Sequence, residues 1–247
     1  MARKLTVLAL AALMGLAVAR VANATWFNVI RGTRNADVLV GTDNRDLVLA
    51  FAGDDQVTAG GGADIVYAGR GNDTVDGGPG FDRIFGGADN DTLVAGEGRA
   101  VIRGGPGNDK VTGGTGFDRI FGGAGDDVLN VGTGPAIVWG AGGNDTITGG
   151  PARNWLHGGQ GDDSVTGGPL RDRLWGGFGV DSENGGDGND VLHSLAPDGQ
   201  VDTLDCGPGD HDVVWIRSGE PDIVLNCEVV KTLQPSKIGR ASCRERV

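Results

Sequence analysis

The chain has 247 residues, of which 48 are glycine, and its formal net charge is −12. Aromatic residues make up only 5% of the sequence, so the large globular core of an ordinary enzyme domain is not available. The acidic balance argues against binding of nucleic acid and favours binding of counterions. A chain this rich in glycine is either disordered or built from a short repeat, and a fixed period decides between the two.

Residues 1–24 are predicted to be a secretory signal peptide. Arg3 and Lys4 supply the charged start, Leu5 to Ala19 is an apolar run, and Ala22-Asn23-Ala24 provides a small-x-small cleavage site. The apolar run is too short for a membrane helix, so no membrane span is expected. The signal predicts export by the general route, and therefore a secreted, extracellular protein.

From Gly32 to His193 the chain divides into blocks of nine without a break in register. The first two blocks read GTRNADVLV and GTDNRDLVL, a later one reads AGRGNDTVD, and the last reads GGDGNDVLH. The shared pattern is G-G-x-G-x-D-x-U-x, where U is a large aliphatic residue. These 162 residues make 162/9 = 18 blocks. So short and unbroken a period indicates a solenoid in which each block stacks on its neighbours.

The pattern resembles the nonapeptide repeat of RTX (haemolysin-type) calcium-binding proteins, and the resemblance covers about two thirds of the chain. It implies an all-β fold, a right-handed parallel β-roll in which two nonapeptides form one coil and calcium lies between stacked turns. The 18 blocks then give about nine coils. In each block the glycines permit positive φ in the turn, and the x-U-x triplet is a short strand with its central side chain inward.

The predicted core is a ladder of the central residues of these triplets. They are aliphatic in every block but one, as a stacked core requires. The exception is Glu183, which is expected to weaken the penultimate coil because a lone buried carboxylate is costly. The two ends of the roll are open sheet edges that need caps. Residues 25–31 are predicted to close the first edge. Residues 194–237, with the strand-like segments 213–216 and 223–225, are predicted to close the second.

Turns of the odd-numbered blocks and turns of the even-numbered blocks lie on opposite sides of the predicted roll; we call them the odd column and the even column. Calcium takes six to eight hard oxygen ligands, which carboxylates and backbone carbonyls of two stacked turns can supply. The alternative is that an Asp at this position only favours a turn. The odd column has Asp at the sixth position of all nine of its blocks, which predicts up to 9 − 1 = 8 calcium sites between turns: Asp37, Asp55, Asp73, Asp91, Asp109, Asp127, Asp145, Asp163 and Asp181.

The even column is incomplete. Ala100, Ala136 and Asn154 stand where its pattern calls for Asp, and Arg or Phe often precedes the sixth position. Three adjacent pairs remain as predicted calcium ligands: Asp46 with Asp64, Asp64 with Asp82, and Asp172 with Asp190.

Outward positions of the even strands carry Arg and aromatic side chains, whereas those of the odd strands are mostly small and polar. A patch of this kind usually marks an interface. It predicts cover by a cap or self-association, or else binding of an acidic polysaccharide or a cell surface, with Arg gripping acidic groups and sugars stacked on the rings. We call this patch the even face; its predicted members are Arg83, Phe85, Arg119, Phe121, Trp139, Trp155, Arg173 and Trp175.

The C-terminal part contains Cys206 and Cys227, an even pair in an exported chain once the tail is set aside. A disulfide is predicted, with free thiols as the alternative. The surrounding LDCGPGDHDVVW and DIVLNCEVV resemble the terminal segment of secreted, largely actinobacterial, RTX-like proteins. His211 falls where the repeat register places Asp, which argues against a calcium site here. Residues 238–247, IGRASCRERV, look like a translated sequencing adapter; a genuine basic tail is the alternative.

No catalytic constellation stands out in the sequence. His157, His193 and His211 are isolated from one another, and the Gly-x-Gly strings belong to the repeat. The sequence therefore predicts a secreted, non-catalytic protein that folds on binding calcium. The alternatives are an adhesin-like module that binds a glycan or partner through the even face, and a fragment of a larger RTX enzyme.

Overall fold

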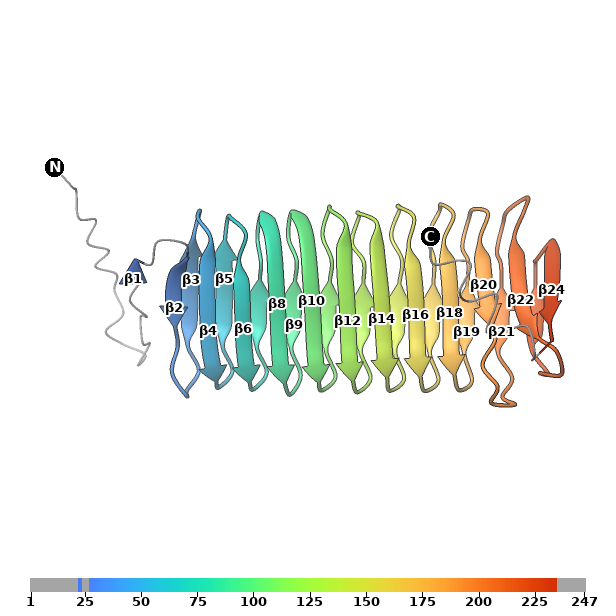
Figure 1. Cartoon of the computed structure of the whole chain (residues 1–247), viewed down its shortest axis with the longest axis horizontal. Coiled ribbons are helices and arrows are strands. Elements are labelled where there is room, and N and C mark those ends of the chain that lie inside the picture. Colours follow the sequence, from blue (N-terminus) through green and yellow to red (C-terminus); the bar gives the residue numbers. More distant parts are fainter. Residues whose placement is uncertain (1–21, 24–26, 235–247) are drawn as a thin grey trace.

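The computed structural model describes residues 22–23 and 27–234. In this part of the chain the strands stack one after another along a single axis and form an elongated two-sheet solenoid (Figure 1). The described residues form no helix, so the predicted all-β fold is confirmed, and nothing among them could cross a membrane as a helix. The predicted signal peptide, apart from Ala22 and Asn23, and the predicted adapter segment lie outside the described residues.

Sheet A contains the strands of the even blocks. It has 13 strands, which are parallel to one another except that β1 pairs antiparallel with β2. In order they are β1 (Ala22–Asn23), β2 (Asn28–Arg31), β4 (Asp46–Ala52), β6 (Ile65–Arg70), β8 (Gly80–Ala88), β10 (Gly98–Pro106), β12 (Asp118–Ala124), β14 (Ala136–Gly142), β16 (Trp155–Gln160), β18 (Arg173–Phe178), β20 (Val191–Ser194), β22 (Val213–Arg217) and β24 (Val229–Leu233).

Sheet B contains the strands of the odd blocks, 11 in number and all parallel. From β2 onward consecutive strands alternate between the two sheets, so each coil gives one strand to each sheet, and the described chain makes about 11 turns. The predicted parallel β-roll is thus confirmed. Sheet B consists of β3 (Val38–Thr42), β5 (Gln56–Gly60), β7 (Thr74–Asp76), β9 (Thr92–Val94), β11 (Lys110–Thr112), β13 (Val128–Asn130), β15 (Thr146–Thr148), β17 (Ser164–Thr166), β19 (Ser182–Asn184), β21 (Thr203–Asp205) and β23 (Ile223–Leu225).

The core is the predicted aliphatic ladder between the sheets. Its members are at most 2% exposed, and they stack on their counterparts in the next coil, as Ile102 does on Ile120. The ladder extends past the repeats through Ile30 at one end and Leu204 and Val214 at the other. Burial of one such side chain contributes about 1.5–3 kcal/mol. With one large side chain per strand the core is thin, so the turns have a large share in deciding whether the coils stay stacked.

Glu183 is buried within this ladder, but it is not isolated. Strand pairing becomes shorter near this residue. β16 pairs with β18 as far as Gln160↔Phe178, whereas β18 pairs with β20 only as far as Trp175↔His193. The Glu183 carboxyl accepts hydrogen bonds from the backbone amides of Gly176 and His193, close to where this pairing ends. Burial raises the pKa of Glu183 well above its usual value, which favours the neutral carboxyl. Glu183 Oε2 is buried without a hydrogen-bond partner, so the expected weakness of this coil stays a prediction.

Close approach of the preceding coil explains why the second position of most blocks is glycine. Gly87 has φ of +128°, and a Cβ on it would collide with the carbonyl oxygen of Gly69 in the preceding coil. Three residues that are not glycine also have positive φ at positions where the pattern has glycine: Phe51 (81°), Asp89 (78°) and Ala141 (90°). A non-glycine residue in this region is strained by roughly 1–3 kcal/mol, so stacking of the coils must impose the conformation.

Both ends continue the sheets. At the N-terminal end β2 stacks on β4, with Asn28 opposite Asp46, and β1 covers part of the free edge of β2. At the C-terminal end the two strand-like segments predicted for the cap are present as β22 and β23, but they add coils in register with the roll. The predicted cap is therefore an extension of the solenoid.

Candidate metal centre

Stacked carboxylates form a continuous ladder along the odd column. The backbone N–H of each Asp donates to Oδ1 of the Asp in the next coil, at 2.7–2.9 Å, from Asp37 through Asp181. All nine predicted odd-column residues belong to it, and each is at most 3% exposed. The nonapeptide period thus brings every one of these carboxylates to the same place between consecutive turns.

The second oxygen of these carboxylates has no hydrogen-bond partner. From Asp55 to Asp181, all eight Oδ2 atoms are buried and unpaired. In the middle turns they face the first glycine of their own block. The position that a Cβ of Gly86 would occupy lies against Asp91 Oδ2 and 2.9 Å from the Gly104 carbonyl oxygen, and the arrangement recurs at Gly104, Gly122, Gly140 and Gly158. A carboxylate oxygen and a carbonyl oxygen of the next coil thus lie close together repeatedly. Gly113 shows the same contact beside the paired Asp118, so the feature of the odd turns that fits a hard cation such as calcium is the unpaired Oδ2.

Burial has a clear effect on the acidity of these groups. Desolvation raises the pKa of Asp55, Asp73 and Asp145 to about 6, and that of Asp91 and Asp127 to about 7. Neighbouring carboxylates add to the rise, while the amide that each accepts lowers it in part. Asp163 and Asp181 also reach a pKa of about 7, from the same causes. A cation between the turns would favour the charged carboxylates that burial disfavours.

The residues that precede the odd-column Asp form a second, exposed ladder that runs the other way. Asn72 N–H donates to Asp54 Oδ1 at 2.8 Å, and Asn108 N–H donates to Asn90 Oδ1 at 2.6 Å; the series continues to Val180 N–H on Asp162. This explains the preference for Asn or Asp at the fifth position of odd blocks, a role that the sequence pattern did not reveal. Arg and Phe cannot accept such bonds, and they are common at this position in the even column.

In the even column, several carboxylates have a backbone N–H donor for Oδ2 and so have a partner there without a cation. Asp118 Oδ1 accepts Ala100 N–H and Oδ2 accepts Gly114 N–H, both at 2.7 Å. Asp172 Oδ2 likewise accepts Gly168 N–H at 2.6 Å. The predicted pairs Asp46/Asp64, Asp64/Asp82 and Asp172/Asp190 stack as the odd residues do, with N–H to Oδ1 distances of 2.7–2.9 Å.

The side-chain amide of Asn154 supplies a hydrogen-bond donor inside its turn. Its Oδ1 accepts Ala136 N–H at 3.1 Å, and its Nδ2 donates to the Ala152 carbonyl at 2.8 Å. An N–H group therefore meets a backbone carbonyl of the turn, and Asn154 has partners for both ends of its amide without a cation.

The backbone at the second position of each block separates the two kinds of Asp. Where that residue has positive φ, as Gly60, Gly105 and Gly186 do, the Asp four residues later has an unpaired Oδ2. Where φ is not positive, the N–H of that residue donates to Oδ2. The paired cases are Thr33 with Asp37, Thr42 with Asp46, Gly114 with Asp118 and Gly168 with Asp172. One dihedral thus decides whether the carboxylate has a protein partner.

The even face is a stack of side chains rather than a row of free rings. Phe121 and Trp139 have ring centroids 4.6 Å apart and lie 5° from parallel, and Tyr67 and Phe85 stack in the same way at 4.7 Å. The Arg103 guanidinium lies over both Phe85 and Phe121. The face of each of these rings therefore packs against a ring of the neighbouring coil, along the long axis of the roll, and does not point into solvent. This geometry disfavours the stacking of sugars on these rings and leaves edges and guanidinium groups for contact.

The remaining predicted members of the even face continue this stack. The ring centroid of Trp175 lies 6.4 Å from that of His157 and 4.7 Å from that of His193. Arg173 covers Trp155, which is 43% exposed, and Arg83 and Arg119 contact Phe81 and Phe117. Two of the three histidines therefore take part in ring stacking.

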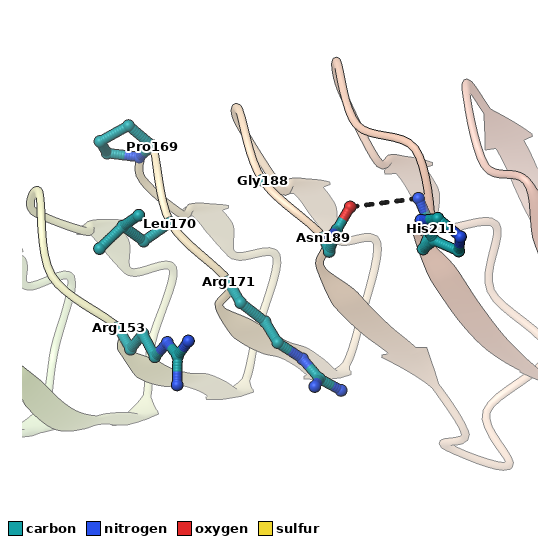
Figure 2. A pocket seen from close by; sticks show the side chains of 7 residues that line it. All are labelled: Arg153, Pro169, Leu170, Arg171, Gly188, Asn189 and His211. Atoms are coloured by element: carbon teal, nitrogen blue, oxygen red, sulfur yellow. Dashed lines mark hydrogen bonds between the residues drawn. The ribbon is translucent and has the colours of Figure 1, made fainter.

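A hollow of about 610 Å³ lies over the turns of the even column near its C-terminal end (Figure 2). His211 is held at its rim by a hydrogen bond from its backbone N–H to Asn189 Oδ1, 3.2 Å long. Among the residues that the structure describes, the one ion pair joins Arg217 and Glu220, so the two arginines here form none. The positive charge of Arg171 still partly offsets the rise in the pKa of Asp190. The lining residues are Arg153, Pro169, Leu170, Arg171, Gly188, Asn189 and His211.

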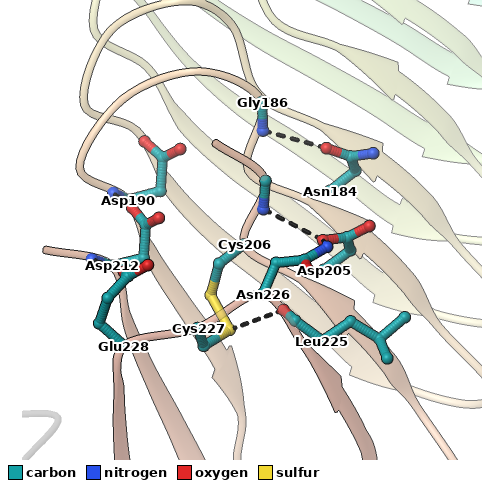
Figure 3. The surroundings of a disulfide bond; sticks show 11 residues. Asn184, Gly186, Asp190, Asp205, Cys206, Asp212, Leu225, Asn226, Cys227 and Glu228 are labelled. Carbon is teal, nitrogen blue, oxygen red and sulfur yellow. Dashed lines mark hydrogen bonds between the residues drawn. A yellow bond between two sulfur atoms is a disulfide. The ribbon is translucent and has the colours of Figure 1, made fainter. Parts of the chain in front are cut away.

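The predicted disulfide between Cys206 and Cys227 is formed, with the Cα atoms 5.2 Å apart (Figure 3). The acidic columns do not stop where the repeats stop. Asp181 N–H donates to Asp202 Oδ1 at 2.9 Å in the odd column, and Asp190 N–H donates to Asp212 Oδ1 at 2.6 Å in the even column. Asp212 takes the Asp position that the repeat register assigned to His211, because this turn has one extra residue. The argument from His211 against a calcium site therefore loses its basis, and calcium binding here stays a prediction. The signal that could have found these residues is the Asp-x-aliphatic triplet at 202–204, 212–214 and 222–224.

No group of three or more His, Cys, Asp or Glu side chains in the described part of the chain could hold a metal ion by itself. The arrangement in the columns is different, because each turn contributes one carboxylate and the rest of the oxygens come from the backbone. The role of the predicted Asp residues as calcium ligands stays a prediction that this geometry fits.

The fold and its repeated acidic turns define a β-solenoid of the calcium-binding repeat class. The model of the family described as RTX calcium-binding nonapeptide repeat (4 copies) matches residues 31–66, 67–102, 103–135, 139–174 and 171–192, more than half of the chain. The chain belongs to this family and is a calcium-binding repeat protein. A search of curated proteins found no match.

Proposed function

We propose that the protein is secreted and non-catalytic, and that its solenoid folds when calcium binds in the odd column. One observation carries the proposal: eight consecutive buried Oδ2 atoms lack a partner in the protein. A disulfide fits an oxidising, extracellular compartment, which supports secretion. The packing of His157 and His193 against Trp175 supports a structural role for these two side chains.

The energetics of the column explain why folding would need the cation. Neighbouring coils are about 5 Å apart, and two ionised carboxylates at that distance repel each other by about 1–3 kcal/mol at an effective dielectric of 80 to 20. The column contains many such neighbours, and the thin aliphatic ladder has little stability to oppose them. A cation that enters between two turns replaces this repulsion by attraction and supplies the missing partner of Oδ2.

The experiment compares the protein with calcium, with chelator, and with chelator plus excess magnesium at pH 7.5. We expect strand content in far-ultraviolet circular dichroism with calcium only, because magnesium demands a tighter octahedral shell and dehydrates reluctantly. Extracellular calcium modules bind with Kd on the order of 10⁻⁴–10⁻³ M, so millimolar calcium should suffice. Strand content that is the same in chelator would contradict the proposal.

A second candidate function is the binding of an anionic partner at the even edge. The observation that favours it is the hollow that contains Arg153 and Arg171, neither of which forms an ion pair in the described structure. Arg pairs bidentately with carboxylate and sulfate groups. Retention of the calcium-loaded protein on immobilised acidic polysaccharide should fall for Arg153→Ser with Arg171→Ser. The exposed odd-block pair Arg34→Ser with Arg70→Ser is the control, and equal retention of the two double variants would exclude this hollow.

A further inference from the structure

The even column continues beyond the last nonapeptide into the disulfide-bonded coils. Asp190 N–H donates to Asp212 Oδ1 at 2.6 Å, and Asp212 N–H donates in turn to Glu228 Oε2 at 2.7 Å. Figure 3 shows these three side chains one after another beside the Cys206–Cys227 bond. Asp212 and Glu228 lie outside the residues that match the nonapeptide family, which end at 192.

Two of these carboxylates lack a partner for their second oxygen. Asp190 and Asp212 are 0% exposed, and the Oδ2 atom of each is buried without a hydrogen bond. The second residues of their turns, Gly186 and Gly207, have φ of +90° and +82°. Both turns therefore have the backbone conformation of the odd column. They differ from the turns of Asp118 and Asp172, in which the N–H of the second residue donates to Oδ2.

Backbone oxygens converge on the same places. The position that a Cβ of Gly185 would occupy lies 2.7 Å from Asp190 Oδ2 and against the carbonyl oxygen of Cys206. The relation among Gly86, Asp91 and Gly104 in the odd column is similar, with the disulfide-bonded cysteine in place of the first glycine of the next turn. Gly113 and Gly167 have the same contact beside the paired Asp118 and Asp172, so the unpaired Oδ2 is what distinguishes the turn of Asp190. A Cβ on Gly209 would likewise meet the Gly188 carbonyl oxygen and both oxygens of Asp212.

We propose that a calcium ion binds here, between the turns of residues 185–190 and 206–212, with Asp190, Asp212 and the Cys206 carbonyl oxygen among its ligands. The inference rests on the proposed function, because it assumes that turns of this backbone and charge take up calcium. The disulfide has a positioning role in this site. It ties the coil that presents the Cys206 carbonyl to Cys227, the neighbour of Glu228, whose carboxylate receives the N–H of Asp212.

The test counts calcium ions per folded chain by equilibrium dialysis for the wild type, Asp212→Asn and the control Asp210→Asn. Asn keeps the Oδ1 acceptor for Asp190 N–H, as Asn154 does for Ala136, while it removes the charge. Asp210 is exposed and two residues away. We expect about one ion fewer in Asp212→Asn and no change in Asp210→Asn.

The outcomes separate the two proposals. If the wild type binds no calcium, the proposed function fails. If the wild type and both variants bind the same number of ions with the same affinity, the site inferred here is excluded while calcium binding by the odd column stands. Because Asp212→Asn could also fail to fold, anomalous scattering from wild-type crystals grown with calcium chloride gives an independent measure. A peak between Asp190 and the Cys206 carbonyl is expected, and peaks confined to the repeats would overturn the inference.

The positioning role of the disulfide has its own readout. In the double variant Cys206→Ala with Cys227→Ala we expect the affinity of this one site to fall roughly tenfold, the effect usual for loss of a group that orients a metal ligand. Binding to the odd column should remain as in the wild type. An unchanged affinity at every site would show that the disulfide does not position the ligands.

Discussion

The odd and even columns are built from the same nonapeptide, yet their aspartates are hydrogen-bonded to different extents. From Asp55 to Asp181 every Oδ2 in the odd column is buried without a partner. In the even column Asp64, Asp82 and Asp190 are unpaired as well, but Asp118 and Asp172 receive a backbone N–H at Oδ2. The comparison teaches that an acidic turn is not by itself a cation site. Its demand for a cation depends on whether the backbone four residues earlier offers its N–H.

The largest effect should come from pH in the absence of calcium. Burial raises the pKa of Asp91, Asp127 and Asp163 from 3.8 to about 7, so their protonated forms favour the folded roll. Their contribution to stability is fully present below the unfolded value and is lost as pH rises through about 6 to 7. With chelator present, circular dichroism should show strands near pH 4.5 that disappear by pH 8.

Saturating calcium should remove this dependence above pH 6, because the ion takes the place of the proton. A calcium-free protein that becomes more stable as pH rises would contradict the assignment of these groups as unpaired carboxyls.

A smaller effect, and the most direct comparison of the columns, is expected from Asp109→Ala and Asp118→Ala. Asp109 lies between intact turns at Asp91 and Asp127, so its loss should remove about two calcium ions. Asp118→Ala should remove none. It should instead lower the free energy of unfolding by about 1–3 kcal/mol, because the N–H groups of Ala100 and Gly114 lose their acceptor.

Calorimetric titration gives the number of ions, and denaturant unfolding in saturating calcium gives the stability. An equal loss of bound calcium in the two variants would mean that the division between paired and unpaired Asp is wrong.

The smallest change is expected from Asn154→Asp, which tests whether the dihedral angle four residues earlier decides the pairing. Gly150 does not have positive φ, so its N–H should donate to the new Oδ2 as Gly114 N–H does to that of Asp118. The Nδ2 that donates to the Ala152 carbonyl becomes an oxygen, so we expect slight destabilisation, on the order of 1 kcal/mol, and the calcium response of the wild type. Thermal unfolding across a calcium titration measures both; stronger stabilisation by calcium than in the wild type would contradict the rule.

The repeat shows how far sequence reasoning reaches. The inward positions, the alternation of strands between two sheets and the membership of each Asp in a column all follow from counting in nines, and the structure confirms the fold. Counting failed at His211, because one inserted residue shifts the register while the backbone absorbs it and returns Asp212 to the column. Nor did it show that the Glu183 carboxyl has amide partners, because Gly176 and His193 lie on strands of the other sheet.

What the sequence determined by itself is local and periodic. A nine-residue period with one aliphatic side chain and one Asp per block leaves a stacked roll as the way to bury the first and align the second. Only the tertiary structure decided which carboxylate oxygens lack partners, because that depends on φ at residues such as Gly105 and Gly114 and on carbonyls of the next coil. It also decided that Phe121 and Trp139 turn their faces to each other. Contacts between coils are set by stacking geometry, which the period implies but whose details it does not contain.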